Sequence, residues 1–530
     1  MTDMFSLLLV TVLQGQPGVA PGDKTERPSG LVANEAGACA GFTLFAPLRS
    51  KTTFLVDMRG EVVHSWENPN PPLGVYLQPD GSLLRCARIE ENPTFHGGGL
   101  GGRIQELAPD GTVTWEYVLS NEKNTLHHDI EPLPNGNLLA LAWEALTREE
   151  AAALGRDPEQ SKSGFWPCWI LEIRPTRPSG GTIVWEWHAK DHLVQDFERT
   201  KAHFGDVTAR PERIDVNADH RDAPPLSPEQ RAEEERRAQE IQALGYSGGD
   251  EEEEGDDDEQ PAKPAGGPPE SGDWLHLNSI DFHPELDLIL VSSPELCEIW
   301  ILDHSTTPAE ARGSTGGRWK KGGDLLWRWG NPRNYGAGTV ADQKLFYQHM
   351  PEWIPAGLPG AGHVTVFNNG KQRPGGEYSS VEELVLPFDP ARGFVRESGQ
   401  PFGPAEPLWS YSDGANFFSF FISGCLRLPN GNTFICSGKQ GRFLEVTPAK
   451  TIVWEYWNPH GGDLAFGMGC AGRGGPPPDA GAPPPADGPP TDGPPPGVPP
   501  GGGSPVEPTS CFRATRIAPD HPGLAALGLR

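Results

Sequence analysis

Short apolar strands that end in an aromatic residue recur along the chain. The six copies are residues 61–66 (EVVHSW), 112–117 (TVTWEY), 182–187 (TIVWEW), 324–329 (DLLWRW), 407–411 (PLWSY) and 451–456 (TIVWEY). Most copies follow another short apolar strand, as at residues 103–108, 169–173, 299–303 and 443–446. A polar loop and a hairpin come next, with turns at residues 79–82, 134–137, 284–287 and 429–432. Each repeat unit is therefore predicted to contain about four strands.

Four short antiparallel strands repeated six times predict an all-β fold, a six-bladed β-propeller. Long loops fall at the same place in each unit, which fits blades around an axis better than a two-sheet sandwich. Residues 511–517 (CFRATRI) are predicted to form a strand that returns to the N-terminal strands and closes the ring. We assign the propeller to residues 31–470, with the returning strand within residues 506–530.

Two segments interrupt the repeats. Residues 222–272 insert a charged helix, with Ser227 as its predicted N-cap, and the acidic run 250–259 (DEEEEGDDDE), which we expect to be solvated and disordered. Residues 471–505 form a low-complexity insertion rich in Pro and Gly. Neither segment is expected to carry chemistry.

Composition and charge narrow the class of protein. Gly and Pro together make up about 23% of the 530 residues, which favours turn-dense β structure over a helical protein. The net charge of −29 disfavours nucleic acid and anionic membrane surfaces as partners. No run of about 18 apolar residues occurs, so no membrane span is expected.

The N-terminus and two cysteines bear on the compartment. Residues 1–30 are interpreted as a signal peptide and a mobile N-terminus, although Asp3 stands where a basic residue is expected before the apolar stretch. Cys470 and Cys511 bracket the Pro/Gly-rich insertion, and they either form a disulfide or remain two buried thiols. We expect a periplasmic or secreted protein.

Histidines occupy equivalent loops in three of the repeat units. They lie in the runs Leu126-His127-His128-Asp129-Ile130, Trp274-Leu275-His276-Leu277-Asn278-Ser279-Ile280 and Phe346-Tyr347-Gln348-His349-Met350. Equivalent loops of a propeller converge at one end of its axis, so we expect His128, His276 and His349 to meet there. Converging imidazoles can supply a nucleophile and donors to a transferred sulfuryl or phosphoryl group. They can also hold zinc, although Asp129 is the only obvious acidic neighbour.

At these residues the chain resembles the arylsulfate sulfotransferase family. The matching pieces are residues 127–130 with 134–137, residues 274–280 with Ser292-Ser293, and Gln348-His349 with residues 367–370. The resemblance extends over most of residues 50–460 and 511–525. It implies a PAPS-independent enzyme, needing no cofactor and no metal. Such an enzyme moves a sulfuryl group from a small aryl sulfate ester to a phenol by a ping-pong mechanism through a sulfated histidine.

The resemblance also implies roles for individual residues. His349 falls on the nucleophile, His276 and His128 on its catalytic partners, and Asn278 and His127 on the substrate-binding positions. The family commonly has an arginine after the Ser-Ser pair to hold the sulfuryl oxygens, whereas this chain has Pro294. Arg333 is the substitute that the sequence offers, on a loop before His349.

Two other functions remain open on the same residues. One is a catalytically silent propeller that binds a small ligand or a partner protein in its central mouth, which the replacement by Pro294 favours. The other is a metal-dependent hydrolase with histidine ligands.

Overall fold

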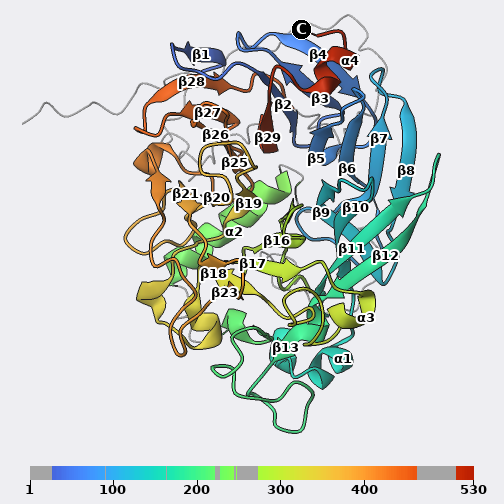
Figure 1. Ribbon diagram of the computed structural model, residues 1–530, viewed down its shortest axis with the longest axis vertical. Helices are drawn as coiled ribbons and strands as arrows, with labels where there is room; N and C mark the ends of the chain where they lie inside the picture. Colours follow the sequence, from blue (N-terminus) through green and yellow to red (C-terminus); the bar gives the residue numbers. More distant parts are fainter. Residues whose placement is uncertain are drawn as a thin grey trace, which may run out of the picture.

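The computed structural model describes residues 27–89, 91–162, 164–220, 227–243, 246, 272–461 and 509–529. These residues form six large β-sheets arranged around a central axis, so the chain is a mainly β, six-bladed propeller, as the repeats predict (Figure 1). Nearly all of the predicted signal segment, the acidic run 250–259, Cys470 and residues 471–505 lie outside the described residues.

Each blade begins with the strand nearest the axis and ends with an outer strand. Blade one contains β29 (Cys511–Ile517), β2 (Phe42–Pro47), β3 (Thr52–Val56) and β4 (Val62–Glu67), and blade two contains β5 (Pro72–Leu77), β6 (Leu83–Arg88), β7 (Gly102–Leu107) and β8 (Val113–Val118). Blade three contains β9 (Asn124–Pro132), β10 (Leu138–Glu144), β11 (Cys168–Pro175) and β12 (Gly181–His188), and blade four contains β15 (Ser279–His283), β16 (Leu288–Ser293), β17 (Glu298–Asp303) and β18 (Trp327–Trp329).

Blade five contains β19 (His349–Trp353), β20 (Val364–Asn368), β21 (Ser380–Leu384) and β24 (Trp409–Tyr411), and blade six contains β25 (Gly424–Arg427), β26 (Thr433–Ser437), β27 (Arg442–Val446), β28 (Ile452–Trp457) and β1 (Gly30–Asn34). Outside the blades, β13 (Leu193–Val194) pairs with β14 (Ile214–Asp215), and β22 (Phe388–Asp389) pairs with β23 (Gly393–Phe394). The α-helices are α1 (Arg148–Ala153), α2 (Pro228–Ala243), α3 (Pro308–Ala311) and α4 (Pro522–Ala526).

The repeated aromatic residues lie on the outer strands, and in blades two to six a tryptophan joins the blade to the next one. In blade one, Trp66 is buried and its Nε1 has no hydrogen-bond partner among the described residues. The indole N–H of Trp115 in blade two donates to the Gly180 carbonyl of blade three at 2.9 Å, and Trp187 donates to the Gly323 carbonyl at 2.7 Å. Trp327, Trp409 and Trp454 make the corresponding bonds to Gly403, Pro448 and Met58. A buried indole needs such a partner, so the tryptophan repeat has a structural cause.

The predicted hairpin turns join the first and second strands of their blades. Pro134 to Asn137 connect β9 to β10, and Gly136 there takes a φ of +83°, which favours glycine. The turns at residues 79–82, 284–287 and 429–432 connect β5 to β6, β15 to β16 and β25 to β26.

Both ends of the described chain close the ring. Strand β29 pairs with β2 as the innermost strand of blade one, as predicted for residues 511–517. Strand β1 pairs with β28 and adds a fifth strand to the outside of blade six, which the repeats do not predict. Cys511 opens β29 and forms no disulfide with another described cysteine. None of the helices in the described ranges has the length and apolarity to cross a membrane.

Candidate active site

The three predicted histidines lie at the same end of the innermost strands. His128 is the middle residue of β9, His276 lies three residues before β15, and His349 is the first residue of β19. The side chains of His128 and His349 are 0% and 5% exposed. His276 is the most exposed of the three, with 18% of its side chain accessible.

Two of these histidines belong to a hydrogen-bonded chain of side chains. His128 Nε2 lies 3.0 Å from His276 Nε2, and His128 Nδ1 lies 2.8 Å from His127 Nδ1. At the other end, His276 Nδ1 is paired with an oxygen of Asp273, a residue that the sequence reasoning missed. His127 is stacked on Trp143 with ring centroids 4.2 Å apart, which fixes the buried end of the chain.

The hydrogen-bonded histidines differ in their protonation state. Burial lowers the pKa of His127 and of His128 well below the usual value, so both are neutral. Burial also lowers the pKa of His276, but the Asp273 carboxylate outweighs it and leaves that pKa above the usual value. His276 therefore carries the positive charge, donates from Nδ1 to Asp273 and donates from Nε2 to His128.

His349 is held in one tautomer by its neighbours. Its Nδ1–H donates to Asn369 Oδ1 at 2.8 Å, and Asn369 is fixed in turn by donating to the Ser419 and Ile422 carbonyls. The backbone N–H of Ile422 donates to His349 Nε2 at 3.1 Å, so the lone pair of the imidazole is on Nε2. Burial lowers the pKa of His349 to about 3 against the raising effect of Asn369, and the charge on His276 lowers it further.

His349 forms no hydrogen bond with His128 or His276 in the described part of the chain. The three imidazoles nevertheless act on one another electrostatically, because the charge of His276 lowers the pKa of His349, and His349 lowers the pKa of His128. The structure thus brings a neutral imidazole, whose Nε2 lone pair accepts only the backbone N–H of Ile422 among the described residues, into the field of one imidazolium. This pairing suits attack on an anionic ester.

Asn278 supports the strand that carries His349. Its side chain is fully buried, and its amide nitrogen donates to the Gln348 carbonyl at 2.9 Å. Ser292 Oγ donates to the same carbonyl at 3.2 Å, and Gln348 Nε2 donates back to Ser292 Oγ and to the carbonyls of Ser293 and Glu298. The Ser-Ser pair and Asn278 therefore position the backbone before His349.

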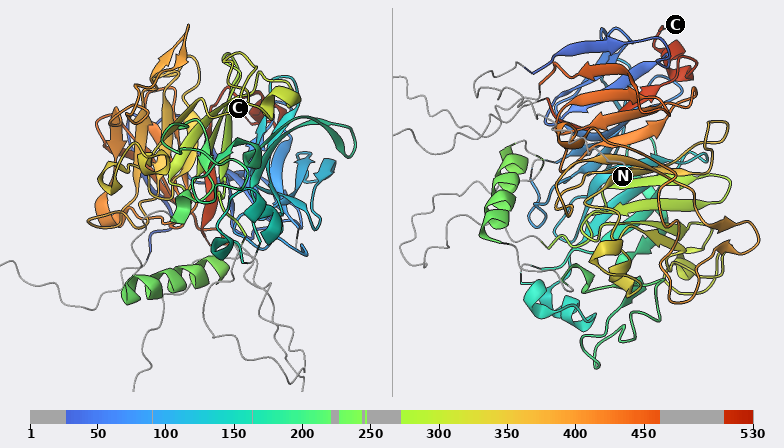
Figure 2. Two further views of the ribbon diagram at one scale, coloured as in Figure 1. Left: turned by 90° about the horizontal axis from the view of Figure 1, so that it is seen from below. Right: turned by 90° about the vertical axis from the view of Figure 1, so that its left-hand side faces the viewer.

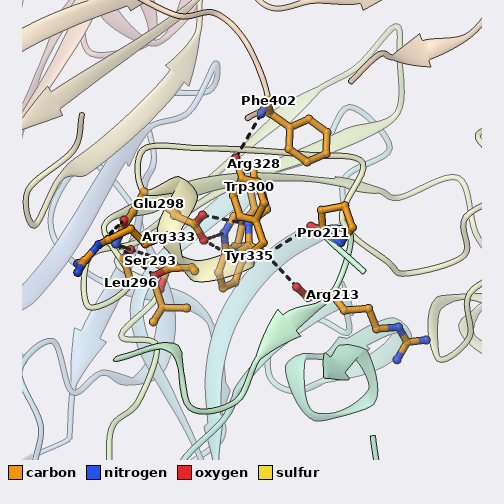
Figure 3. A network of polar contacts seen from close by, with 12 residues as sticks. Pro211, Arg213, Ser293, Leu296, Glu298, Trp300, Arg328, Arg333, Tyr335 and Phe402 are labelled. Carbon is orange, nitrogen blue, oxygen red and sulfur yellow. Dashed lines mark hydrogen bonds and ion pairs between the residues drawn. The ribbon is translucent and has the colours of Figure 1, made fainter. Parts of the chain in front are cut away.

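Arg333 has its contacts away from the histidines. Its guanidinium donates to Asn331 Oδ1 at 3.3 Å and to Gln343 Oε1 at 3.4 Å. Figure 3 shows Arg333 and Leu296 to the left of the buried ion pair that Arg328 forms with Glu298. The structure does not bring Arg333 together with His128, His276 and His349.

A different arginine acts on the histidines electrostatically. Arg513 comes from the closing strand β29, and its side chain is 5% exposed. It forms an ion pair with Asp129 at 2.8 Å and donates to the Tyr76 hydroxyl at 2.9 Å. Its positive charge lowers the pKa of both His128 and His349. No local pattern in the sequence points to Arg513, because it lies far along the chain from the histidine motifs.

A run of glycines allows the backbone to lie directly on the histidine pair. A Cβ on Gly99 would stand 2.1 Å from His128 Nε2, and Gly99 has a φ of +73°. A Cβ on Gly98 would stand 3.4 Å from His276 Cε1. The loop between β6 and β7 thus covers His128 at a distance that only glycine permits, and it also lies next to His276.

The arrangement of the donor groups bears on the metal alternative. Across residues 27–461 and 509–529, excluding the undescribed gaps, no group of three or more His, Cys, Asp or Glu side chains is arranged to hold a metal ion.

The comparison with known families places the chain in a class. The family model described as Arylsulfotransferase (ASST) matches residues 39–460, which is most of the chain. The chain therefore belongs to the arylsulfotransferase family, as the motifs at the three histidine loops imply.

Solved structures are similar to this chain only at low sequence identity. No curated protein matches the chain. A protein of unknown function from Bacteroides caccae has 12% identity and a TM-score of 0.37, with 79% of this chain and 93% of that chain covered. A periplasmic gluconolactonase from Pseudomonas aeruginosa has 11% identity and a TM-score of 0.37, with 79% and 96% covered. Virginiamycin B lyase from Staphylococcus aureus has 10% identity and a TM-score of 0.32, with 81% and 89% covered.

Proposed function

We propose that this protein is a PAPS-independent sulfotransferase that moves a sulfuryl group from an aryl sulfate ester to a phenol through a sulfated His349. Membership of the arylsulfotransferase family supports this activity and aryl sulfates as substrates. The observation that carries the mechanism is the tautomer of His349. Its Nδ1–H is bound to Asn369, burial keeps the ring neutral, and the lone pair is left on Nε2.

In the first half-reaction, His349 Nε2 exchanges the Ile422 N–H bond for a bond to the sulfur of the donor. The bond between sulfur and the aryl oxygen breaks, and its electron pair leaves with that oxygen as a phenolate. His276 exchanges its bond to His128 Nε2 for a bond to the phenolate oxygen and donates its Nε2 proton there, and the free phenol departs. Aryl esters react faster than alkyl esters because a phenol has a pKa near 10, so its anion leaves readily.

The second half-reaction runs in reverse with another phenol. The acceptor hydroxyl gives its proton to the now neutral His276, and its oxygen attacks the sulfur on His349. The bond from sulfur to Nε2 breaks, and its electron pair returns to the imidazole. Asn369 holds Nδ1–H throughout, and no resident metal or cofactor takes part in these steps.

Pro294 favours a second candidate function. Without an arginine at that position, the mouth can bind an anionic aromatic ligand and leave it unchanged. The buried charges of His276 and Arg513 support turnover, because they act at the same end of the axis as His349. A periplasmic or secreted location remains part of the proposal and rests on the apolar residues 4–13.

Replacement of His349 tests the proposal. We expect His349→Ala to abolish phenol release from a chromogenic aryl sulfate, with little change in melting temperature. The matched control is His64→Ala, because His64 lies on the outer strand β4 and bonds only the Pro109 carbonyl at 2.9 Å. If wild type releases no phenol from any aryl sulfate, the protein is a binder and not a transferase. Stoichiometric metal in the purified protein would support the hydrolase instead.

A further inference from the structure

The inserted helix lies across the end of the propeller that holds the histidines. Helix α2 joins blades three and four in the sequence, yet Figure 1 shows it over the middle of the ring, and Figure 2 shows it flat against one end of the blades. Ser227 caps it as predicted, since the Gln230 N–H donates to Ser227 Oγ at 3.2 Å.

Charged contacts hold the helix on the loops of blades five and six. Arg237 forms two bonds with Glu377, at 2.9 and 2.5 Å, and its guanidinium lies 5.2 Å from the Phe420 ring centroid. Glu234 pairs with Lys371 at 2.6 Å, and Glu240 pairs with Lys439 at 3.0 Å. All six side chains of these three ion pairs are about one third exposed or less, so water screens the contacts only in part.

Beyond the helix, Tyr246 enters the site. Its side chain is 4% exposed, and its ring packs against His128 with centroids 5.9 Å apart. Phe421 at 5.5 Å and Phe512 at 6.3 Å complete an aromatic pocket around the phenol ring. The Tyr246 carbonyl accepts the Gly99 N–H at 3.2 Å, which ties it to the glycine loop over His128.

The ring of Tyr246 lies close to His276 and is linked through Phe421 to the backbone that bonds His349. A Cβ on Gly98 would stand 2.8 Å from Tyr246 Cε1 and 3.4 Å from His276 Cε1, so only a glycine separates this ring from His276. Phe421, which packs on Tyr246, directly precedes Ile422, whose N–H is bound to His349 Nε2. Ile422 has a φ of +51°, an unfavourable backbone conformation for a β-branched residue.

The Tyr246 hydroxyl has no hydrogen-bond partner among the described residues, although its oxygen is buried. A buried hydroxyl without a partner weakens the docked arrangement. The Tyr246 ring is thus held by aromatic contacts alone, without a hydrogen bond from its hydroxyl. Another phenol can therefore replace it in the pocket.

We propose that the pocket of His128, Phe421 and Phe512 is the binding site for the aryl ring of the substrates, and that Tyr246 is an internal phenol that they displace. The proposal rests on the proposed function for the identity of the ligand. In the docked arrangement α2 and Tyr246 shield the histidines, and an aryl sulfate or a phenol reaches them when Tyr246 and α2 move away.

Hydrogen exchange on the full chain tests displacement without any turnover. Phenol alone is the probe, because it cannot react without a sulfate donor. We expect phenol to increase amide exchange across residues 228–243 in wild type, with saturation. Tyr246→Ala should bind phenol several-fold more tightly than wild type, because no internal ring competes. Unchanged or slower exchange in α2 on saturation with phenol would overturn the proposal.

Two neighbouring arginines provide the activity test. Arg237→Ala removes the ion pair with Glu377 and should raise kcat/KM for a chromogenic aryl sulfate several-fold. Arg236→Ala is the matched control, because Arg236 is 72% exposed and pairs with Glu233 on the same helix, and kcat/KM should stay at the wild-type value.

The two proposals fail in different ways. If no variant turns over any aryl sulfate while phenol still releases α2, the proposed function is wrong and the aryl site stands. If wild type turns over and Arg237→Ala lowers kcat/KM while its helix exchanges freely, Tyr246 is not an obstacle and the inference is wrong.

Discussion

At the scale of single residues, the chemistry depends on two imidazoles in opposite states. His349 is neutral because it is buried, and His276 is protonated because Asp273 lies against it. Activity requires both states at once. It therefore rises as the pH increases past the pKa of His349, about 3, and falls as the pH increases past the pKa of His276, which lies above its usual value.

Replacing Asp273 separates the general acid from the nucleophile. Asp273→Asn removes the charge that raises the pKa of His276, so we expect the alkaline limb of the profile of kcat/KM against pH to move to lower pH. Loss of a general acid costs on the order of 10²–10⁴ in rate for an ester of an unactivated phenol. The loss should be much smaller for a nitrophenyl ester, whose anion leaves without a proton.

Asp110→Asn is a suitable control for that experiment, because Asp110 lies in an exposed turn where it accepts the Thr112 N–H. Equal losses for good and poor leaving groups in Asp273→Asn would mean that Asp273 supports only the fold.

At the scale of secondary-structure elements, the loop that carries Gly99 packs on His128, and substitution of its glycine tests this contact. Gly99 and Gly136 both have positive φ, but a Cβ meets His128 Nε2 at 2.1 Å at the first position and nothing within 4 Å at the second. Gly136→Ala should therefore cost about 1 kcal/mol and leave transfer unchanged. Gly99→Ala should cost more and abolish transfer, because the loop or His128 must shift.

Denaturant unfolding and phenol release measured on both glycine variants decide this point. Equal stability and full activity in Gly99→Ala would show that the loop does not need to lie on His128.

The closing strand β29 brings a buried charge to the axis, and its energetics can be measured. Arg513→Met leaves the fully buried Asp129 without its cation, which should destabilise the protein by about 3–5 kcal/mol in denaturant unfolding. Adding Asp129→Asn should recover part of that loss, because no uncompensated buried charge then remains. Simple addition of the two single losses would contradict a direct pair.

At the scale of the whole molecule, the repeats were enough to predict the fold. Five of the six aromatic strands carry a tryptophan that bonds the next blade, as an outer strand can. The Pro-Asn-Gly-Asn turns form hairpins because glycine accepts a positive φ. These signals are local and recur, so they are readable without a structure. Strand β1 has no counterpart in the other blades, and its pairing was not predicted.

The site was only partly predictable, for a physical reason. His128, His276 and His349 lie in motifs at equivalent points of the repeat. Asp273 directly follows the insertion and pairs with His276 only three residues later. Arg513 arrives from the far end of the chain and reaches Asp129 only when the ring closes. Sequence reasoning assigned no chemistry to the insertion that carries Tyr246, because its composition is charged and it breaks the repeat.

The central claim is that the sulfuryl group passes through His349, and trapping that intermediate tests it most directly. The protein is mixed with an aryl sulfate in the absence of an acceptor. The reaction is quenched under alkaline conditions that preserve the nitrogen–sulfur bond of a sulfated imidazole, and the protein is digested for mass spectrometry. We predict one equivalent of released phenol and one sulfuryl group on the peptide that contains His349, both absent from His349→Ala. Phenol release with no modified peptide, or a sulfuryl group on another residue, would contradict the account.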